Sequence, residues 1–190
     1  MDQFARTVLG YHSCTEEFAR DLLLGKKAIS EWELSENRWD WLGHGIYFWE
    51  HSPERALRWA REQHEPKGEK AAIIGAVVQL GKSFDLLNEG ITAILADSYK
   101  ELRRVFRQRK EPIPKNTGKD WKLRMRDCLV INDCLEKLAE GGTAYDTVRG
   151  AFTEGEPVYP GAGFSREAHI QIAVRNRDCI LGIFRPNLLS

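Results

Sequence analysis

Apolar side chains occur in short runs along this chain, separated by polar and glycine-rich stretches, and the runs predict strands. Side chains along a strand point alternately to its two faces, so half-buried strands alternate and fully buried strands are continuously apolar. Predicted strands or short extended pieces occupy 8–12, 71–80, 84–87, 144–151, 170–174 and 179–184, with an aromatic strand that follows a glycine turn within 40–50. The last two strands, 170–174 and 179–184, are expected to be neighbours.

Helical spacing of apolar residues and helix-start signals predict four helices. Thr15 followed by two acids is a typical N-cap, and Gly25 ends that helix. Ser52-Pro53-Glu54 opens a second helix that runs to about residue 64. The remaining helices are expected over 91–109 and 128–140, and the segments 26–39, 111–120 and 154–164 are expected to be loops.

The order of these elements predicts an α+β fold whose sheet is assembled from distant segments. The chain has 190 residues, enough for one domain with a proper core. We therefore expect a single domain over 1–190, with a helical and loop insertion at about 90–140.

Composition indicates an ordinary globular protein without a membrane partner. The chain is 42% hydrophobic and 29% charged, with a formal net charge of zero. No apolar run approaches the roughly 20 residues that span a bilayer, and the first residues lack the pattern of a secretory signal. Four cysteines without a CxxC pair predict reduced thiols, and no metal site is expected. These features predict a cytoplasmic protein.

Charge is distributed unevenly, because residues 100–126 contain eleven Lys or Arg and three Asp or Glu. This segment of the insertion has a net charge of +8, with Phe106 and Trp121 interleaved. Basic groups bind phosphates and aromatic rings stack on unpaired bases, which favours RNA or single-stranded DNA as a partner. The structural alternative, a solvated helix face with a charged loop, has at least as much support, and an acidic partner such as an antitoxin would also fit. The candidate nucleic-acid residues are Arg103, Arg104, Arg107, Arg109, Lys110 and Lys122.

Three windows carry candidate chemistry: Tyr11-His12-Ser13, the run Gly43–Trp49, and 154–171. Taken singly, each has an ordinary structural interpretation. A histidine at a strand end is commonly a hydrogen-bonding residue, and a tyrosine in an aromatic strand commonly packs in the core. The two glycines near Tyr47 precede no helix, so they do not form a dinucleotide-binding fingerprint.

Taken in order, the windows resemble the PARP-like, diphtheria-toxin class of ADP-ribosyltransferases. In that family a His and a small residue end the first strand, G-x-Y-F begins another, and a Glu or a substitute lies on a later strand. The matches are Tyr11-His12-Ser13, Gly45-Ile46-Tyr47-Phe48 and the strand around Gln171. Residues 40–50 also resemble uncharacterised bacterial proteins of this fold. The resemblance implies a split antiparallel sheet with flanking helices, and NAD as the substrate without a metal.

The resemblance also implies roles for individual residues. His12 would bind a ribose hydroxyl, and Tyr47, flanked by Phe48 and with Tyr11 nearby, would stack on nicotinamide. Ser13, where the family commonly has Gly, and Gly45 would allow close backbone approach to the carboxamide. Arg149 would meet the NAD diphosphate or, equally, form a surface salt bridge.

The third catalytic position stays open between Gln171 and Glu167, because strand alternation places both on the face that also carries His169. Glu154 and Glu156 in the preceding loop are further candidates. A carboxylate would stabilise the oxocarbenium ion that forms when nicotinamide leaves the ribose, whereas glutamine carries no charge.

The expected function is NAD-dependent ADP-ribosyl transfer to a macromolecule, either RNA or single-stranded nucleic acid or a protein. Small bacterial members of the resembling family often act as toxins or defence effectors. One alternative is an NAD glycohydrolase, in which water is the acceptor. Another is a non-catalytic NAD or ADP-ribose-binding module, which Gln171 would suit. A phosphotransferase-like protein acting on RNA ends is a weaker alternative, since it requires several basic residues around the pocket.

Overall fold

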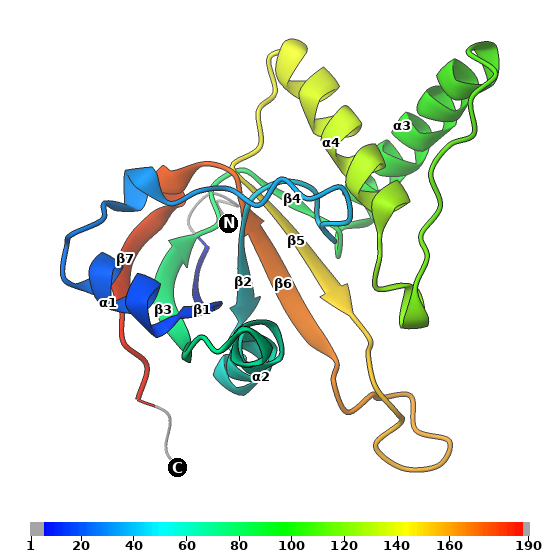
Figure 1. The fold of residues 1–190 in the computed structure, drawn as a ribbon. Helices are drawn as coiled ribbons and strands as arrows, with labels where there is room; N and C mark the ends of the chain where they lie inside the picture. Colours follow the sequence, from blue (N-terminus) through cyan, green and yellow to red (C-terminus); the bar gives the residue numbers. More distant parts are fainter. Residues whose placement is uncertain (1–5, 188–190) are drawn as a thin grey trace.

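The structure is a computed structural model and describes residues 6–187. Its strands are β1 (Thr7–Thr15), β2 (Ile46–Glu50), β3 (Ala71–Gln79), β4 (Ser83–Asp85), β5 (Thr147–Phe152), β6 (His169–Val174) and β7 (Ile180–Phe184). Its α-helices are α1 (Glu16–Leu23), α2 (Pro53–His64), α3 (Glu89–Gln108) and α4 (Met125–Glu140). Within the described residues the strands form one seven-stranded sheet in the order β4-β5-β6-β2-β1-β3-β7, flanked by helices (Figure 1). The α+β prediction is confirmed.

Two expectations about the sheet are wrong. β6 lies between β5 and β2, whereas β7 pairs with β3 at the far edge. Both edges of β6 are already occupied, so the chain passes over the end of the sheet to the free edge of β3. The sheet is also not purely antiparallel, because β4 and β5 are parallel. Parallel neighbours need a long crossover connection, and the segment that contains α3 and α4 supplies it.

Local signals fixed most helix ends. The Thr15 side chain accepts a hydrogen bond from the Phe18 N–H, as expected of an N-cap, and Pro53 begins α2. α3 begins two residues before its predicted start, because the Asn88 side chain caps it at the N–H groups of Gly90 and Ile91. All four cysteines are buried and unbridged, as predicted. Among residues 6–187, no helix is long and apolar enough to cross a membrane.

Different helices cover the two faces of the sheet. α1 and the segment that holds Trp32 pack on the face that carries Phe48 and Ile74. On the opposite face, α2 packs against Trp49 and Ile73. α4 packs on that same face farther along, with Ile131, Cys134 and Leu135 against Val148 and Ala173. Figure 1 shows α3 and α4 projecting away from the β4–β5 end of the sheet.

The sheet separates between β1 and β2. β1 pairs with β3 at all nine of its residues, and β2 pairs with β6 at four. β1 and β2 are paired at only two positions in the described chain, Gly10 with Glu50 and Tyr11 with Trp49. Gly10 permits this close crossing, because a Cβ atom there would lie 2.8 Å from the Phe48 Cβ. Beyond Tyr11 the two strands diverge, and this divergence creates the space described below.

A buried ionic cluster ties three strands together. Arg149 Nε and Nη2 donate to the two carboxylate oxygens of Glu50 at 2.6 and 3.0 Å, and Nη1 donates to Asp85 Oδ2 at 3.0 Å. Both Arg149 and Glu50 are buried. The Glu50 carboxylate raises the pKa of Arg149, so the guanidinium stays charged. This bidentate pair fixes the end of β2 to β5 and β4.

We predict that Arg149→Leu lowers the free energy of unfolding by about 3 kcal/mol, because it leaves the Glu50 carboxylate buried without its main partner. Urea denaturation of the purified protein measures this change. Arg103→Leu, at an exposed position of α3, is the control and should change stability by less than about 0.5 kcal/mol. Equal unfolding midpoints for the two variants would contradict the structural role of Arg149.

Candidate functional site

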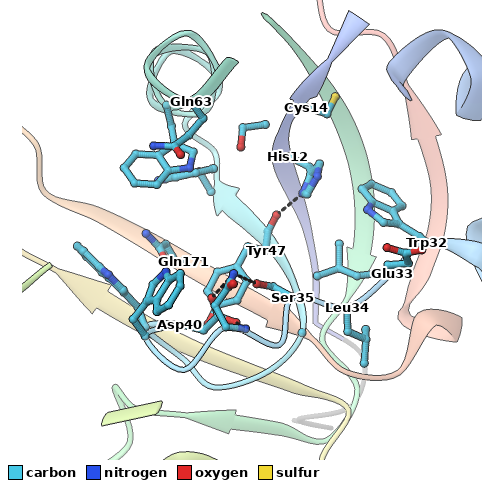
Figure 2. Close-up of a pocket in the computed structure, with 18 of the residues that line it drawn as sticks. His12, Cys14, Trp32, Glu33, Leu34, Ser35, Asp40, Tyr47, Gln63 and Gln171 are labelled. Atoms are coloured by element: carbon cyan, nitrogen blue, oxygen red, sulfur yellow. Dashed lines mark hydrogen bonds between the residues drawn. The ribbon is translucent and has the colours of Figure 1, made fainter. Parts of the chain in front are cut away.

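A cavity of about 830 Å³ opens where β1 and β2 diverge. This volume is typical of small-molecule sites, which span about 300–1,000 Å³. Its walls come from β1, β2, β6 and α2 and from the segment around 32–41, so both faces of the sheet contribute (Figure 2). Segments that are far apart in the sequence therefore meet around one cavity.

Each of the three sequence windows contributes side chains or backbone to the cavity wall, but some of the predicted site residues lie elsewhere. The predicted residues that line it are His12, Ser13, Gly45, Tyr47, Lys122, Glu154 and Gln171. The predicted residues that are not part of the lining are Tyr11, Phe48, Arg149, Glu156, Glu167, Arg103, Arg104, Arg107, Arg109 and Lys110. Phe48 instead packs in the core beneath His12, and Tyr11 packs beside α2 on the opposite face.

His12 bridges the gap between the diverging strands. Its Nδ1 lies 2.8 Å from the Tyr47 carbonyl oxygen, the contact drawn as a dashed line in Figure 2. A carbonyl oxygen only accepts, so Nδ1 carries the proton and Nε2 of the neutral ring is left as an acceptor. The ring packs edge-on against Trp32, with centroids 4.8 Å apart. Burial lowers the pKa of His12 to about 4, so the ring is neutral at pH 7 and suited to accept from a hydroxyl group.

Ser13 lies on the strand edge that faces the gap. Backbone groups along a strand point alternately to its two neighbours, so Leu9, Tyr11 and Ser13 point to the same side. The Leu9 carbonyl oxygen accepts from the His51 N–H beyond the end of β2, which identifies that side as the β2 side. Because β1–β2 pairing stops at Tyr11, Ser13 directs its N–H and C=O toward the cavity. This pair of backbone groups matches the donor and acceptor of a carboxamide.

Two hydrogen bonds hold the Tyr47 hydroxyl against the turn that precedes β2. Its hydroxyl donates to the Gly43 carbonyl oxygen at 2.6 Å and accepts from the Leu42 N–H at 2.8 Å. Burial raises the pKa of Tyr47 well above its ordinary value, so the phenol stays neutral. Gly43 has a φ of 73°, and a Cβ atom there would lie 2.6 Å from Asn132 Oδ1. The tight turn therefore requires glycine and fixes the Tyr47 ring in the cavity wall.

Gly45 lines the cavity, but its backbone groups are engaged elsewhere. Its N–H donates to the Ser35 carbonyl oxygen at 3.1 Å, and its carbonyl oxygen accepts from the Ser35 N–H at 2.9 Å. Gly45 therefore forms a part of the cavity wall without a side chain, while its N–H and C=O are paired with Ser35. The segment 26–39, predicted as an irregular loop, forms this bridge and contributes Trp32 and Trp39 to the cavity wall.

Of the three candidate glutamates, Glu154 is the one in the cavity wall. Its side chain is 8% exposed and pairs with Arg55 Nη2, while Lys122 Nζ lies 4.0 Å from Oε1. Glu167 precedes β6, and its carboxylate turns outward to Arg58 at 3.3 Å. Glu156 is exposed. Gln171 is buried in the cavity wall, so Gln171 and Glu154 are the two of the four candidates that line the cavity.

The expectation that Arg149 meets a diphosphate is wrong for this structure. Its guanidinium is buried and its donors are engaged by Glu50 and Asp85 on the opposite face of the sheet from Tyr47. The sequence window gave no signal for this pairing, because Glu50 is 99 residues away.

Sequence reasoning missed several residues of the site. Arg55 and His169 pack around Glu154, and Trp32, Trp39 and Trp41 line one side. The three tryptophans within ten residues were a usable signal, since large aromatic side chains in a loop often mark a binding site. The Trp49 Nε1–H is buried and has no acceptor among the described residues.

The basic insertion reaches the cavity at one end. Arg103, Arg104, Arg107, Arg109 and Lys110 are exposed, and none forms an ion pair within residues 6–187 whose side chains are described. At the other end, Lys122 lines the cavity, and its carbonyl oxygen accepts from Trp41 Nε1 at 2.9 Å. The neighbouring Trp121 is 65% exposed. Lys122 therefore brings one basic group of this segment to the cavity, whereas the other five cations lie on α3 and just after it.

Comparison with protein-family models, with curated proteins and with solved structures found no match for this chain. Among the described residues, no three His, Cys, Asp or Glu side chains are grouped as a metal ion requires.

The lowered pKa of His12 predicts a pH-dependent stability. The unfolded ring takes up a proton below about pH 6.5, whereas the folded ring does so only near pH 4, so this contribution is present at neutral pH and lost between these values. We expect a loss of about 3 kcal/mol over this window. Urea unfolding at pH 7 and pH 4 measures it, with His12→Asn as the comparison, since Asn keeps the donor at the Nδ1 position and does not titrate. The same pH dependence in both proteins would contradict the assignment.

Proposed function

We propose that this chain binds NAD in the cavity between β1 and β2 and transfers ADP-ribose to a macromolecular acceptor. The observation that carries the proposal is the meeting of three groups at one split in the sheet: the His12 Nε2 acceptor, the Ser13 backbone edge and the fixed Tyr47 ring. These are the groups by which the resembling transferases hold a ribose, a carboxamide and a nicotinamide ring.

Each group suits one part of NAD. The Ser13 N–H and C=O can pair with the carboxamide oxygen and amide group of nicotinamide. The neutral His12 Nε2 can accept from a ribose hydroxyl. The Tyr47 ring offers a π-face to the cationic nicotinamide, an attraction that weakens once the ring leaves as a neutral molecule. Such a site favours departure of nicotinamide without a general acid, because the electrons of the breaking bond neutralise the ring nitrogen.

Glu154 supplies the carboxylate that glutamine at position 171 lacks. As the bond between ribose C1′ and nicotinamide breaks, positive charge develops on the sugar, and a nearby carboxylate stabilises it. The acceptor nucleophile then forms a bond to C1′ and loses its proton. Glu154 pairs with Arg55, which holds its side chain in place, and it lines the same cavity as Tyr47 and Gln171.

We predict that Glu154→Gln lowers kcat for nicotinamide release from NAD about a hundredfold, because the stabilising charge is lost while the size of the side chain is kept. Glu156→Gln, two residues away and exposed, is the matched control and should retain wild-type turnover. Nicotinamide release is measured by chromatography. Equal turnover in the two variants would remove Glu154 from the mechanism, and no release by the wild-type protein would refute the proposed function.

The exposed basic surface favours a single-stranded polynucleotide as the acceptor. Five cations on α3 and just after it lack an acidic partner in the described chain, Lys122 lines the cavity, and Trp121, beside it in the sequence, is exposed. Such surfaces bind single strands through phosphate contacts and base stacking.

Incubation of the protein with labelled NAD, cell protein and RNA distinguishes the acceptors. Label that survives protease and is lost to nuclease supports a polynucleotide acceptor. Label lost to protease identifies a protein acceptor, and nicotinamide release without label identifies a glycohydrolase. Binding of NAD without any release identifies a non-catalytic module, the alternative that Gln171 suggests.

We predict that the triple variant Arg103→Ala, Arg104→Ala, Arg107→Ala weakens RNA modification and reduces its salt dependence. Loss of three phosphate contacts should lower the slope of log affinity against log salt by about 2. The matched control removes three other exposed charges, with Lys26→Ala, Lys67→Ala and Lys70→Ala, and should keep the wild-type slope. NAD turnover without acceptor should be unchanged in both. An unaltered slope in the α3 variant would leave its arginines as a solvated helix face.

A further inference from the structure

Two neighbouring side chains on β6, His169 and Gln171, are joined by a hydrogen bond beside the cavity. Gln171 Nε2 lies 3.0 Å from His169 Nε2, and His169 Nδ1 lies 2.7 Å from the Glu167 carbonyl oxygen. Both side chains are buried, and Gln171 lines the cavity. The position of each proton in this chain of bonds follows from the partners.

The Glu167 carbonyl oxygen can only accept, so His169 Nδ1 carries a proton. A neutral ring has one proton, which leaves His169 Nε2 as an acceptor. Nε2 must then receive its hydrogen bond from the amide nitrogen of Gln171, the atom that faces it. The carboxamide therefore has a fixed orientation, with Oε1 on the side away from His169. Oε1 has no hydrogen-bond partner among the described residues of the chain.

The groups around His169 keep the ring neutral. Burial is the main cause that lowers its pKa, and the Arg55 guanidinium on α2 acts in the same direction. The Glu154 carboxylate, 3.8 Å from Nδ1, and the Glu167 carboxylate oppose this shift, but each is itself paired with an arginine. The Trp41 and Phe152 rings pack against the imidazole with centroids 6.2 and 5.8 Å away.

We propose that His169 is a positioning residue which holds the Gln171 carboxamide with its oxygen directed to the cavity. The proposal rests on the proposed function, because the group that this oxygen meets is then a ribose hydroxyl of NAD. Gln171 accepts a hydrogen bond from that hydroxyl and turns the negative end of its dipole to the sugar. Glutamine thereby performs the orienting part of a carboxylate's role, and Glu154 provides the charge.

The orientation depends on the protonation state of His169. When a second proton binds, Nε2 becomes a donor and repels the Gln171 amide nitrogen. The carboxamide then rotates, its oxygen faces the imidazolium, and its N–H groups point into the cavity. Because the pKa of His169 lies below the ordinary value of about 6.5, this change occurs as the pH falls below neutrality, and turnover should fall with it. His12, with a pKa of about 4, accounts for a separate loss at lower pH.

Two substitutions at His169 separate positioning from packing. His169→Gln places a side-chain oxygen near the former Nε2, so it can still accept from Gln171. His169→Phe keeps an aromatic ring packed against Trp41 and Phe152 and offers no acceptor. We expect His169→Phe to lower kcat about tenfold with KM within twofold of wild type, as for loss of one oriented hydrogen bond. His169→Gln should retain kcat within about twofold, and its pH profile should lack the limb due to His169.

If the wild type consumes NAD, kcat and its pH dependence in the two variants are sufficient to test the positioning role of His169. Equal kcat in both folded variants, or an unchanged acid limb in His169→Gln, overturns the role of His169 while the proposed function stands. If the wild type consumes no NAD, the proposed function is wrong, and NMR of the ¹⁵N-labelled protein decides the positioning. The expected spectrum has a proton on His169 Nδ1, none on Nε2, and a Gln171 side-chain amide that shifts as His169 titrates. A proton on Nε2 near neutral pH overturns the proposal.

Discussion

The hydrogen bond from His12 Nδ1 to the Tyr47 carbonyl oxygen is the contact on which the site depends. In a continuous sheet this carbonyl would accept from the backbone of the neighbouring strand. Here β1 and β2 have already diverged, and a side chain spans the distance that the backbone no longer spans. The bond therefore gives the Tyr47 carbonyl oxygen of β2 a hydrogen-bond donor and fixes the tautomer of His12. It also spans the gap between the strands in which the cavity lies. One contact thus connects the packing of the sheet to the hydrogen-bonding chemistry of the cavity.

The divergence itself is maintained from both sides of the sheet. Gly10 lets β1 cross close over Phe48, and the Arg149–Glu50–Asp85 cluster fixes the far end of β2 to β5 and β4. Trp32 then packs against His12, and the Tyr47 hydroxyl ties its own strand to the preceding turn. Apart from the local bond of the Tyr47 hydroxyl, these contacts join residues that are distant in sequence, so the cavity forms only when the whole sheet has assembled.

Local sequence signals predicted the elements well, because caps, prolines and apolar runs act within a few residues. Thr15 caps α1, Pro53 begins α2, and the apolar run 71–80 forms β3, each as its local sequence predicts. Such local signals do not show which strands or side chains pair when they are far apart in the sequence. The adjacency expected for the last two strands was wrong because β6 already had two neighbours, and the surface role offered for Arg149 was wrong because Glu50 buries it. His12 and Tyr47 could be selected as candidates because residue type and order along the chain are informative even when the contacts are unknown. Both line the cavity.

The charges in the cavity bear on whether glutamine at the third position implies a loss of catalysis. His12 and Tyr47 are both held neutral by burial, and Gln171 carries no charge, so these groups can bind and orient but add no negative charge. A cavity with these groups alone would suit a binding module. Glu154 lines the same cavity, however, and its contacts with Arg55 and Lys122 hold the carboxylate in place without removing it from the cavity. In the proposed mechanism the two functions that a single glutamate would combine, orientation and charge, are divided between Gln171 and Glu154, so a glutamine at 171 does not by itself favour the non-catalytic alternative.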